Sequence, residues 1–144
     1  MRKFIVLMFA ALLGAAHPAA ADEQRTATVY KSPTCGCCNG HVEYLRLMGY
    51  RVTVHEVQDL MPVKEKYGVP AHLQSCHTAL IGGYVVEGHV PVAAIERLLA
   101  EKPNIKGISL PGMPEGSPGM NGQKRGPFVY YEIAPGAPKV YATD

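Results

Sequence analysis

Long runs of one kind of residue are missing from this sequence. Its longest apolar stretch, Phe4 to Ala16, has about a dozen residues and stops just before Pro18, whereas a spanning helix needs roughly 20. It has no run of lysine or arginine, so it offers no electrostatic surface to nucleic acid. It also has no His/Asp/Ser arrangement suited to hydrolysis. These absences argue against a membrane anchor, a nucleic-acid-binding protein and a hydrolase.

The first residues have the order of a secretory signal peptide. The basic Arg2-Lys3 precedes the apolar stretch, and three alanines ending at Ala21 provide the small residues of a cleavage site. We therefore expect residues 1–21 to be cleaved on export to the periplasm of a Gram-negative bacterium. No lipid-attachment cysteine follows, so we expect no membrane association after cleavage. Losing Arg2 and Lys3 leaves 12 basic and 12 acidic residues in the mature chain.

The next segment, residues 22–102, has the pattern of one α/β domain. Residues 26–30, 51–57, 78–81 and 84–87 read as strands, the last two as a hairpin around Gly82-Gly83. Apolar residues recur at helical spacing from about Cys37 to Gly49 and from Pro91 to Glu101, and 62–67 is a candidate short helix. A parallel pair with a crossover followed by a hairpin is the order of a thioredoxin-like domain.

Residues 103–144 differ in composition and are expected to form an irregular C-terminal extension. The stretch from Leu110 to Gly122 is rich in proline and glycine and carries Met113 and Met120. A simple linker has no use for methionine side chains, so we expect this extension to contribute ligands to a metal site. Residues 127–132 and 139–143 read as two late strands.

Four cysteines are the strongest candidates for chemistry. Cys35, Cys37 and Cys38 crowd together, and only Cys76 is distant. Two structural disulfides would be the first expectation for an exported protein, but this spacing would force a very short, strained loop. The motif follows a predicted strand and opens a predicted helix, whose N-terminus favours thiolates. A third adjacent thiol would invite wrong disulfides in a dithiol exchange site, whereas it suits a metal site.

Cys76 lies directly before the third predicted strand. In a thioredoxin-like topology the loop entering that strand faces the start of the first helix, so Cys76 and His77 should meet the cysteine motif. Thiolates bind Cu(I) or zinc, whereas methionine is not a usual zinc ligand. Met113 and Met120 therefore make copper the best candidate. Four thiolates with thioethers exceed what one Cu(I) needs, which indicates several coppers bridged by sulfur.

The other histidines and methionines are weaker candidates. His41 lies near the motif and can equally be a surface residue, and His89 precedes the last helix and can equally bond backbone groups there. His55 and His72 are not expected to bind metal. Met48 is expected in the core, on the apolar face of the first helix.

Five motifs together are similar to those of the CopG family of periplasmic proteins found with copper-resistance systems. They are S-P-T-C-G-C-C at 32–38, G-V-P at 68–70, S-C-H-T at 75–78, E-G-H-V-P at 87–91 and P-G-M-P-E-G-S-P-G-M at 111–120. The resemblance covers about residues 28–120, without departure in the motifs.

The resemblance implies a thioredoxin-like domain whose extension helps to bind metal. It further implies a cysteine-bridged multicopper cluster and interconversion of Cu(I) and Cu(II), which assists detoxification by efflux components. Carried over, Cys35, Cys37, Cys38 and Cys76 are the cluster cysteines, and the first three are its redox residues. Met113, Met120 and His77 are the further ligand candidates. We expect a monomer.

Three alternatives remain open at this stage. A thiol–disulfide oxidoreductase would use Cys35 and Cys38, although His77 occupies the place where such proteins ordinarily have a cis-proline. A passive Cu(I) chaperone or buffer would hold copper without electron transfer. A structural zinc site is the least favoured, because of the methionines.

Overall fold

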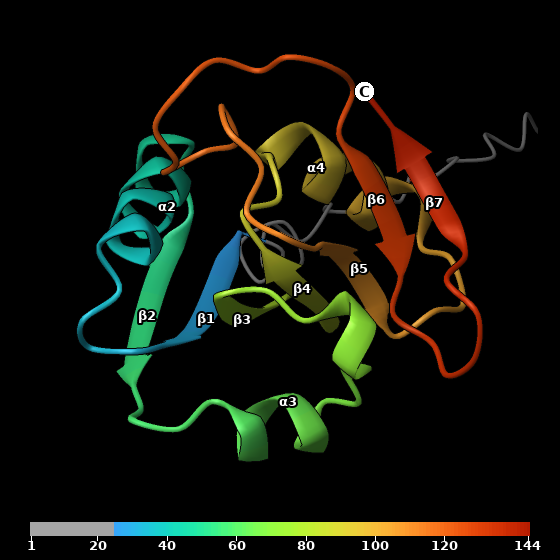
Figure 1. Ribbon diagram of the computed structural model, residues 1–144, viewed down its shortest axis with the longest axis horizontal. Helices are drawn as coiled ribbons and strands as arrows, with labels where there is room; N and C mark the ends of the chain where they lie inside the picture. The colour runs from blue at the N-terminus through green and yellow to red at the C-terminus, as the bar shows by residue number, and fades with distance from the viewer. Residues whose placement is uncertain (1–24) are drawn as a thin grey trace, which may run out of the picture.

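The computed structural model describes residues 25–144, which form one seven-stranded sheet with helices on both faces (Figure 1). The signal peptide predicted at residues 1–21 lies outside the described residues. The strands are β1 (Thr26–Lys31), β2 (Arg51–Glu56), β3 (His77–Ile81), β4 (Tyr84–Gly88), β5 (Gly107–Leu110), β6 (Val129–Glu132) and β7 (Val140–Thr143). The helices are α2 (Gly36–Leu47), α3 (Met61–Lys66) and α4 (Val92–Glu101), with a 3₁₀ turn, η1 (Ala71–Leu73). Within residues 25–144, no helix is long and apolar enough to cross a bilayer.

The first four strands have the arrangement expected from the sequence. β1 and β2 are parallel and are joined by α2, and β3 lies antiparallel to β1 on its other side. β3 and β4 form the predicted hairpin. Its two turn residues, Gly82 and Gly83, have φ angles of +55° and +84°, which a two-residue turn of this hand requires and glycine supplies without strain.

The C-terminal residues continue the same sheet rather than forming a wholly irregular extension. β5 pairs in parallel with β4, and β6 and β7 follow in antiparallel order to give the sequence β2-β1-β3-β4-β5-β6-β7. β6 and β7 confirm the two late strands, whereas β5 was not predicted. The expectation of an irregular extension is therefore wrong for β5, β6 and β7, and the longest stretch of the extension without a helix or strand is residues 111–128.

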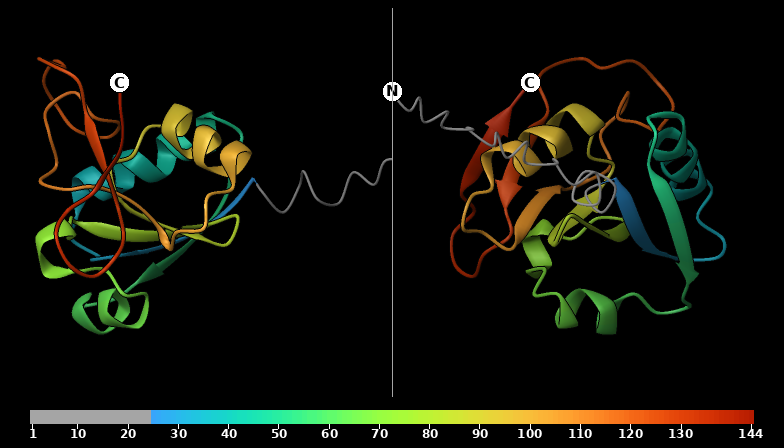
Figure 2. Two further views of the ribbon diagram at one scale, coloured as in Figure 1. Left: turned by 90° about the vertical axis from the view of Figure 1, so that its right-hand side faces the viewer. Right: turned by 180° about the vertical axis from the view of Figure 1, so that it is seen from behind.

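Two helices cover one face of the sheet and α3 lies against the other (Figure 2). α4 buries its apolar side, with Ile95 and Leu98 fully enclosed, and burying each such side chain stabilises the fold by roughly 1.5–3 kcal/mol. α2 buries Val42 and Leu45 in the same way, but His41 on this face is also fully buried. A buried imidazole in an apolar layer needs polar partners, and these partners belong to the candidate site.

Candidate metal centre

The cysteine motif lies at the start of α2, just after the loop that follows β1. Cys35 is the residue before the helix, with extended backbone, and its carbonyl accepts the first helical hydrogen bond, from the N–H of Asn39 (3.3 Å). Cys37 and Cys38 therefore lie in the first turn, Cys37 half-buried and Cys38 fully buried. The free N–H groups of this turn favour negative charge at the sulfur atoms.

The four cysteines converge, as the sequence predicted. Cys35 and Cys38 form a disulfide, and Cys37 and Cys76 are free thiols. The Sγ atoms of Cys35 and Cys37 are 3.5 Å apart, and all four Sγ atoms lie within 4.8 Å of one another. Such spacing brings every sulfur within reach of a shared soft metal ion.

Two histidines bring nitrogen donors to the same place. Cys38, Cys76, His77 and His89 form a second group whose ligand atoms all lie within 4.8 Å. The Cys76 Sγ atom is 2.8 Å from His89 Nε2 and 3.3 Å from His77 Nδ1. The two groups share Cys38 and Cys76, so they form one continuous site of four sulfur and two nitrogen donors.

Backbone carbonyls determine which ring nitrogens are bare. The Val90 carbonyl can only accept, so His41 Nε2 (3.0 Å away) carries a proton and its Nδ1 accepts from His77 Nε2 (2.9 Å). In a neutral His77, Nδ1 is then unprotonated. Likewise His89 Nδ1 donates to the Pro118 carbonyl (2.6 Å), which leaves Nε2 bare. Both nitrogens that face Cys76 therefore present lone pairs.

Burial keeps these rings neutral. Desolvation lowers the pKa of His41 to about 4, against a partial opposing effect of its bond to Val90. Burial also lowers the pKa of His77, reinforced by the charges of the other two histidines, and lowers that of His89. Burial, with a further contribution from Cys37, raises the pKa of the Cys76 thiol to about 12. A metal ion that binds Cys76 must therefore displace its proton.

A buried ion pair supports the loop that carries Cys76. Glu87 is fully buried and pairs with the buried Lys64. The same carboxylate accepts the N–H of Ser75 (2.7 Å) and the hydroxyl of Thr78 (2.6 Å), which flank Cys76 on both sides. Burial raises the pKa of Glu87, so the carboxylate depends on these donors to stay charged.

The proline- and glycine-rich segment lies against the start of α2 (Figure 1). A Cβ on Gly119 would come within 2.7 Å of the Cys37 carbonyl oxygen, so the two backbones touch. The bond from His89 to Pro118 ties the segment down one residue earlier. The half-buried Met120 follows directly. Met113 is 39 % exposed and has a φ of +50°, unusual for a residue with a side chain.

Several predicted placements differ from the structure. Met48, expected in the core, is 45 % exposed because α2 ends at Leu47 and turns it outward. His41 and His89, rated as weak candidates, are fully buried inside the site. His41 could have been found, since it lies three residues after Cys38 on one helical face. His55 stacks on Tyr30, outside both donor groups.

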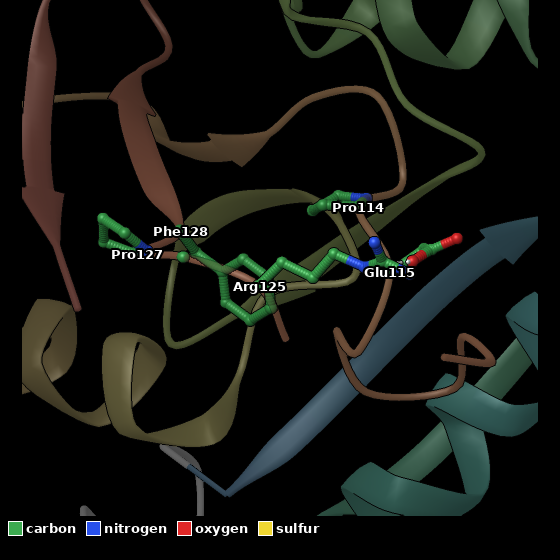
Figure 3. A pocket seen from close by; sticks show the side chains of 6 residues that line it. Pro114, Glu115, Arg125, Pro127 and Phe128 are labelled. Carbon is green, nitrogen blue, oxygen red and sulfur yellow. Dashed lines mark ion pairs between the residues drawn. The ribbon is translucent and has the colours of Figure 1, made fainter. Parts of the chain in front are cut away.

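A separate hollow of about 260 Å³ lies on the extension (Figure 3). It is lined by Pro114, Glu115, Arg125, Gly126, Pro127 and Phe128. The Arg125 and Glu115 side chains form an ion pair across 3.3 Å. No cysteine or histidine is among the lining residues, so this hollow is not part of the metal centre.

Comparisons with known proteins show which family the chain belongs to. The family described as "Protein of unknown function, DUF411" matches residues 73–120, the part that carries Cys76, His77 and His89. No curated protein matches the chain. The solved structure titled "Copper resistance protein copG- Form 1" is 38% identical, with a TM-score of 0.75, over 85% of this chain and 98% of that one. "Copper resistance protein copG- Form 2" is also 38% identical, with a TM-score of 0.74, over 83% and 97%. The chain therefore belongs to the CopG family of copper resistance proteins.

Proposed function

We propose that this protein binds copper through the cysteine site and interconverts Cu(I) and Cu(II) as part of copper resistance, with copper as its substrate. The observation that carries the proposal is the convergence of four cysteine sulfurs and two bare imidazole nitrogens around Cys76. Sulfur donors favour Cu(I), and imidazole is compatible with both oxidation states. A mixed set of this kind can hold copper in either state.

The ligands in this proposal are Cys35, Cys37, Cys38, Cys76, His77, Met113 and Met120, to which the geometry adds His89. This set exceeds the two or three soft ligands of a single Cu(I). We therefore propose several coppers bridged by cysteine sulfur, with Cys35, Cys37 and Cys38 as the redox-active residues. The contact of Gly119 with the first turn of α2 supports a part for Met120, its neighbour in sequence.

A thioredoxin-like domain over residues 22–102, followed by the extension 103–144, is the scaffold we propose. The strand order β2-β1-β3-β4, with β1 and β2 parallel and the hairpin antiparallel, supports it. The predicted signal peptide and the copper-resistance relatives favour action in the periplasm. We propose that the protein acts there as a monomer that cooperates with copper efflux components.

A thiol–disulfide oxidoreductase is the second candidate, because Cys35 and Cys38 form a disulfide at a helix N-terminus. The third free thiol, Cys37, lies 3.5 Å from Cys35 and would compete in every exchange step. A passive Cu(I) buffer is the other alternative.

The test is metal content and the visible spectrum of protein from copper-supplemented periplasm, wild type beside Cys37→Ser. We expect several coppers per chain and a colour that responds reversibly to oxidant and reductant. In the variant, both the copper content and the colour response should be lower. One copper or fewer per chain would remove the multicopper cluster. Copper held only as colourless Cu(I) would favour the buffer. Metal-free protein that reduces a test disulfide despite a copper chelator would favour the oxidoreductase.

A further inference from the structure

We infer that the Cys35–Cys38 pair is the internal electron source of the site: as a dithiol it reduces two Cu(II) ions and becomes the disulfide found in the structure. This inference rests on the proposed function and adds to it the origin of the electrons. Within the three redox-active cysteines of the proposed function, it divides the tasks: Cys35 and Cys38 supply the electrons, and Cys37 helps to hold the copper that receives them.

The first observation is which cysteines are paired. Cys37 Sγ is only 3.5 Å from Cys35 Sγ, yet the disulfide joins Cys35 to Cys38, and Cys37 stays free. Both paired residues lie at the start of α2, where the helix N-terminus favours the thiolate form from which electrons are lost. Cys35 and Cys38 therefore form the two-electron couple.

The second observation is what remains when this couple is oxidised. Cys37 and Cys76 are free thiols, and the Cys76 sulfur is faced by His89 Nε2 at 2.8 Å and His77 Nδ1 at 3.3 Å. Oxidation of Cys35 and Cys38 thus leaves two thiols and two bare imidazole nitrogens in one place. This residual set is soft enough to keep the Cu(I) that the reaction produces.

The electrons and atoms balance within the site and its substrate. The S–H bonds of Cys35 and Cys38 break, one S–S bond forms, and the two electrons pass singly to two Cu(II) ions, giving two Cu(I). The two protons go to water, which reaches the half-buried Cys35. A dithiol reductant outside the protein must restore the pair before a second round. One round needs no other reactant.

The experiment uses the whole mature protein, fully reduced, metal-free and without oxygen, titrated with Cu(II). Electron paramagnetic resonance counts the remaining Cu(II), and alkylation followed by peptide mass spectrometry counts and locates the lost thiols. We expect the first two equivalents to lose their Cu(II) signal while two thiols disappear as the Cys35–Cys38 disulfide. Cys35→Ser and Cys38→Ser, made separately, should both keep the Cu(II) signal over the same period.

The double variant C37S/C76S separates electron supply from copper retention. We expect it to lose the copper on gel filtration and to react with Cu(II) more slowly, because two ligands are gone, while the disulfide that forms still joins Cys35 to Cys38. A wild-type protein that keeps its Cu(II) signal with four thiols intact would overturn the inference, as would a disulfide that involves Cys37 or Cys76. A parallel titration with Cu(I) tests the proposed function alone, since failure to retain Cu(I) counts against copper binding and not against the electron source.

Discussion

Gly40 of α2 and Gly119 of the extension touch through their backbones: a Cβ on Gly40 would lie 2.9 Å from the Gly119 Cα. Real Cβ atoms do not approach this closely, so a methyl group here must displace the segment. We predict that Gly40→Ala lifts residues around 119 from the first turn of α2 and weakens copper retention by about 10-fold or more, the size expected when support for a metal ligand is lost. Competition with a Cu(I) chelator measures it.

A matched control separates this displacement from helix propensity. Gly36→Ala adds a methyl to the same helix, where it meets no atom within 4 Å. Both substitutions replace glycine in α2 by alanine, a gain of at most about 1 kcal/mol that is smaller at Gly36, the first helical residue. If Gly36→Ala and Gly40→Ala weaken copper retention equally, the contact with Gly119 has no part in holding the site.

The methionines of the extension give a second prediction. Met120→Leu and Met113→Leu keep size and apolarity but remove the thioether, and we expect each to lower Cu(I) retention, with Met120 the larger effect because it is half-buried beside the Gly119 contact. Met48→Leu is the control, since Met48 is 45 % exposed at the end of α2. Equal retention by all four proteins would exclude thioether ligands.

A third prediction concerns the buried pair of Lys64 and Glu87. Glu87→Gln leaves the Lys64 ammonium buried without its counter-charge, and breaking such a pair costs about 3–5 kcal/mol. Urea unfolding of the metal-free protein measures this loss. The double variant K64M/E87Q removes both charges and should recover most of the stability. If the single variant is as stable as wild type, the pair does not support the loop of Cys76.

Acid should destabilise the metal-free protein through its buried histidines. The pKa of His41 falls from 6.5 to about 4 on folding, so between these values the unfolded chain binds a proton that the folded protein refuses. The contribution of neutral His41 to the free energy of unfolding is therefore fully present above pH 6.5 and is lost as the pH falls toward 4. For His41 alone the loss between pH 7 and pH 5 is about 2 kcal/mol.

Urea unfolding of the metal-free protein at pH 7 and pH 5 measures this loss. The same two measurements on the copper-loaded protein give its free energy of unfolding for comparison. His77 and His89, whose pKa values are also lowered, act in the same direction. An unchanged unfolding free energy across this range would mean that the three rings are not buried neutral in solution.

Much of the fold could be predicted from local sequence patterns. The apolar spacing of α4 and the Gly82-Gly83 hairpin are decided by neighbouring residues, and both were predictable. β5 was not, because its sequence Gly-Ile-Ser-Leu has one β-branched residue and no aromatic residue, whereas β6 and β7 each combine valine with tyrosine. It is a strand through its partner: a Cβ on Gly107 would lie 1.8 Å from the Val85 carbonyl, so only glycine allows this approach to β4.

The part of the site that could be predicted is the part whose position follows from the order of the strands and helices. Cys76 was expected beside the motif because the start of β3 faces the start of α2 in a fold of this order. The place of His89 was not foreseeable, since it depends on the Pro118 carbonyl, 29 residues further along the chain. Contacts of this kind are made by the irregular segment 111–128, whose path no periodicity describes.

That segment is anchored at both ends in one sheet, by β5 and by β6. A loop whose two ends are both fixed in the sheet has already lost much of its conformational entropy when the protein folds. The entropic cost of ordering residues 111–128 is therefore a cost of folding and not of metal binding. Under the proposed function, a copper ion that reaches the site therefore finds residues 111–128 already in place. The extension is therefore not a detachable module: removing it would strip three strands from the sheet and expose β4 as an open edge.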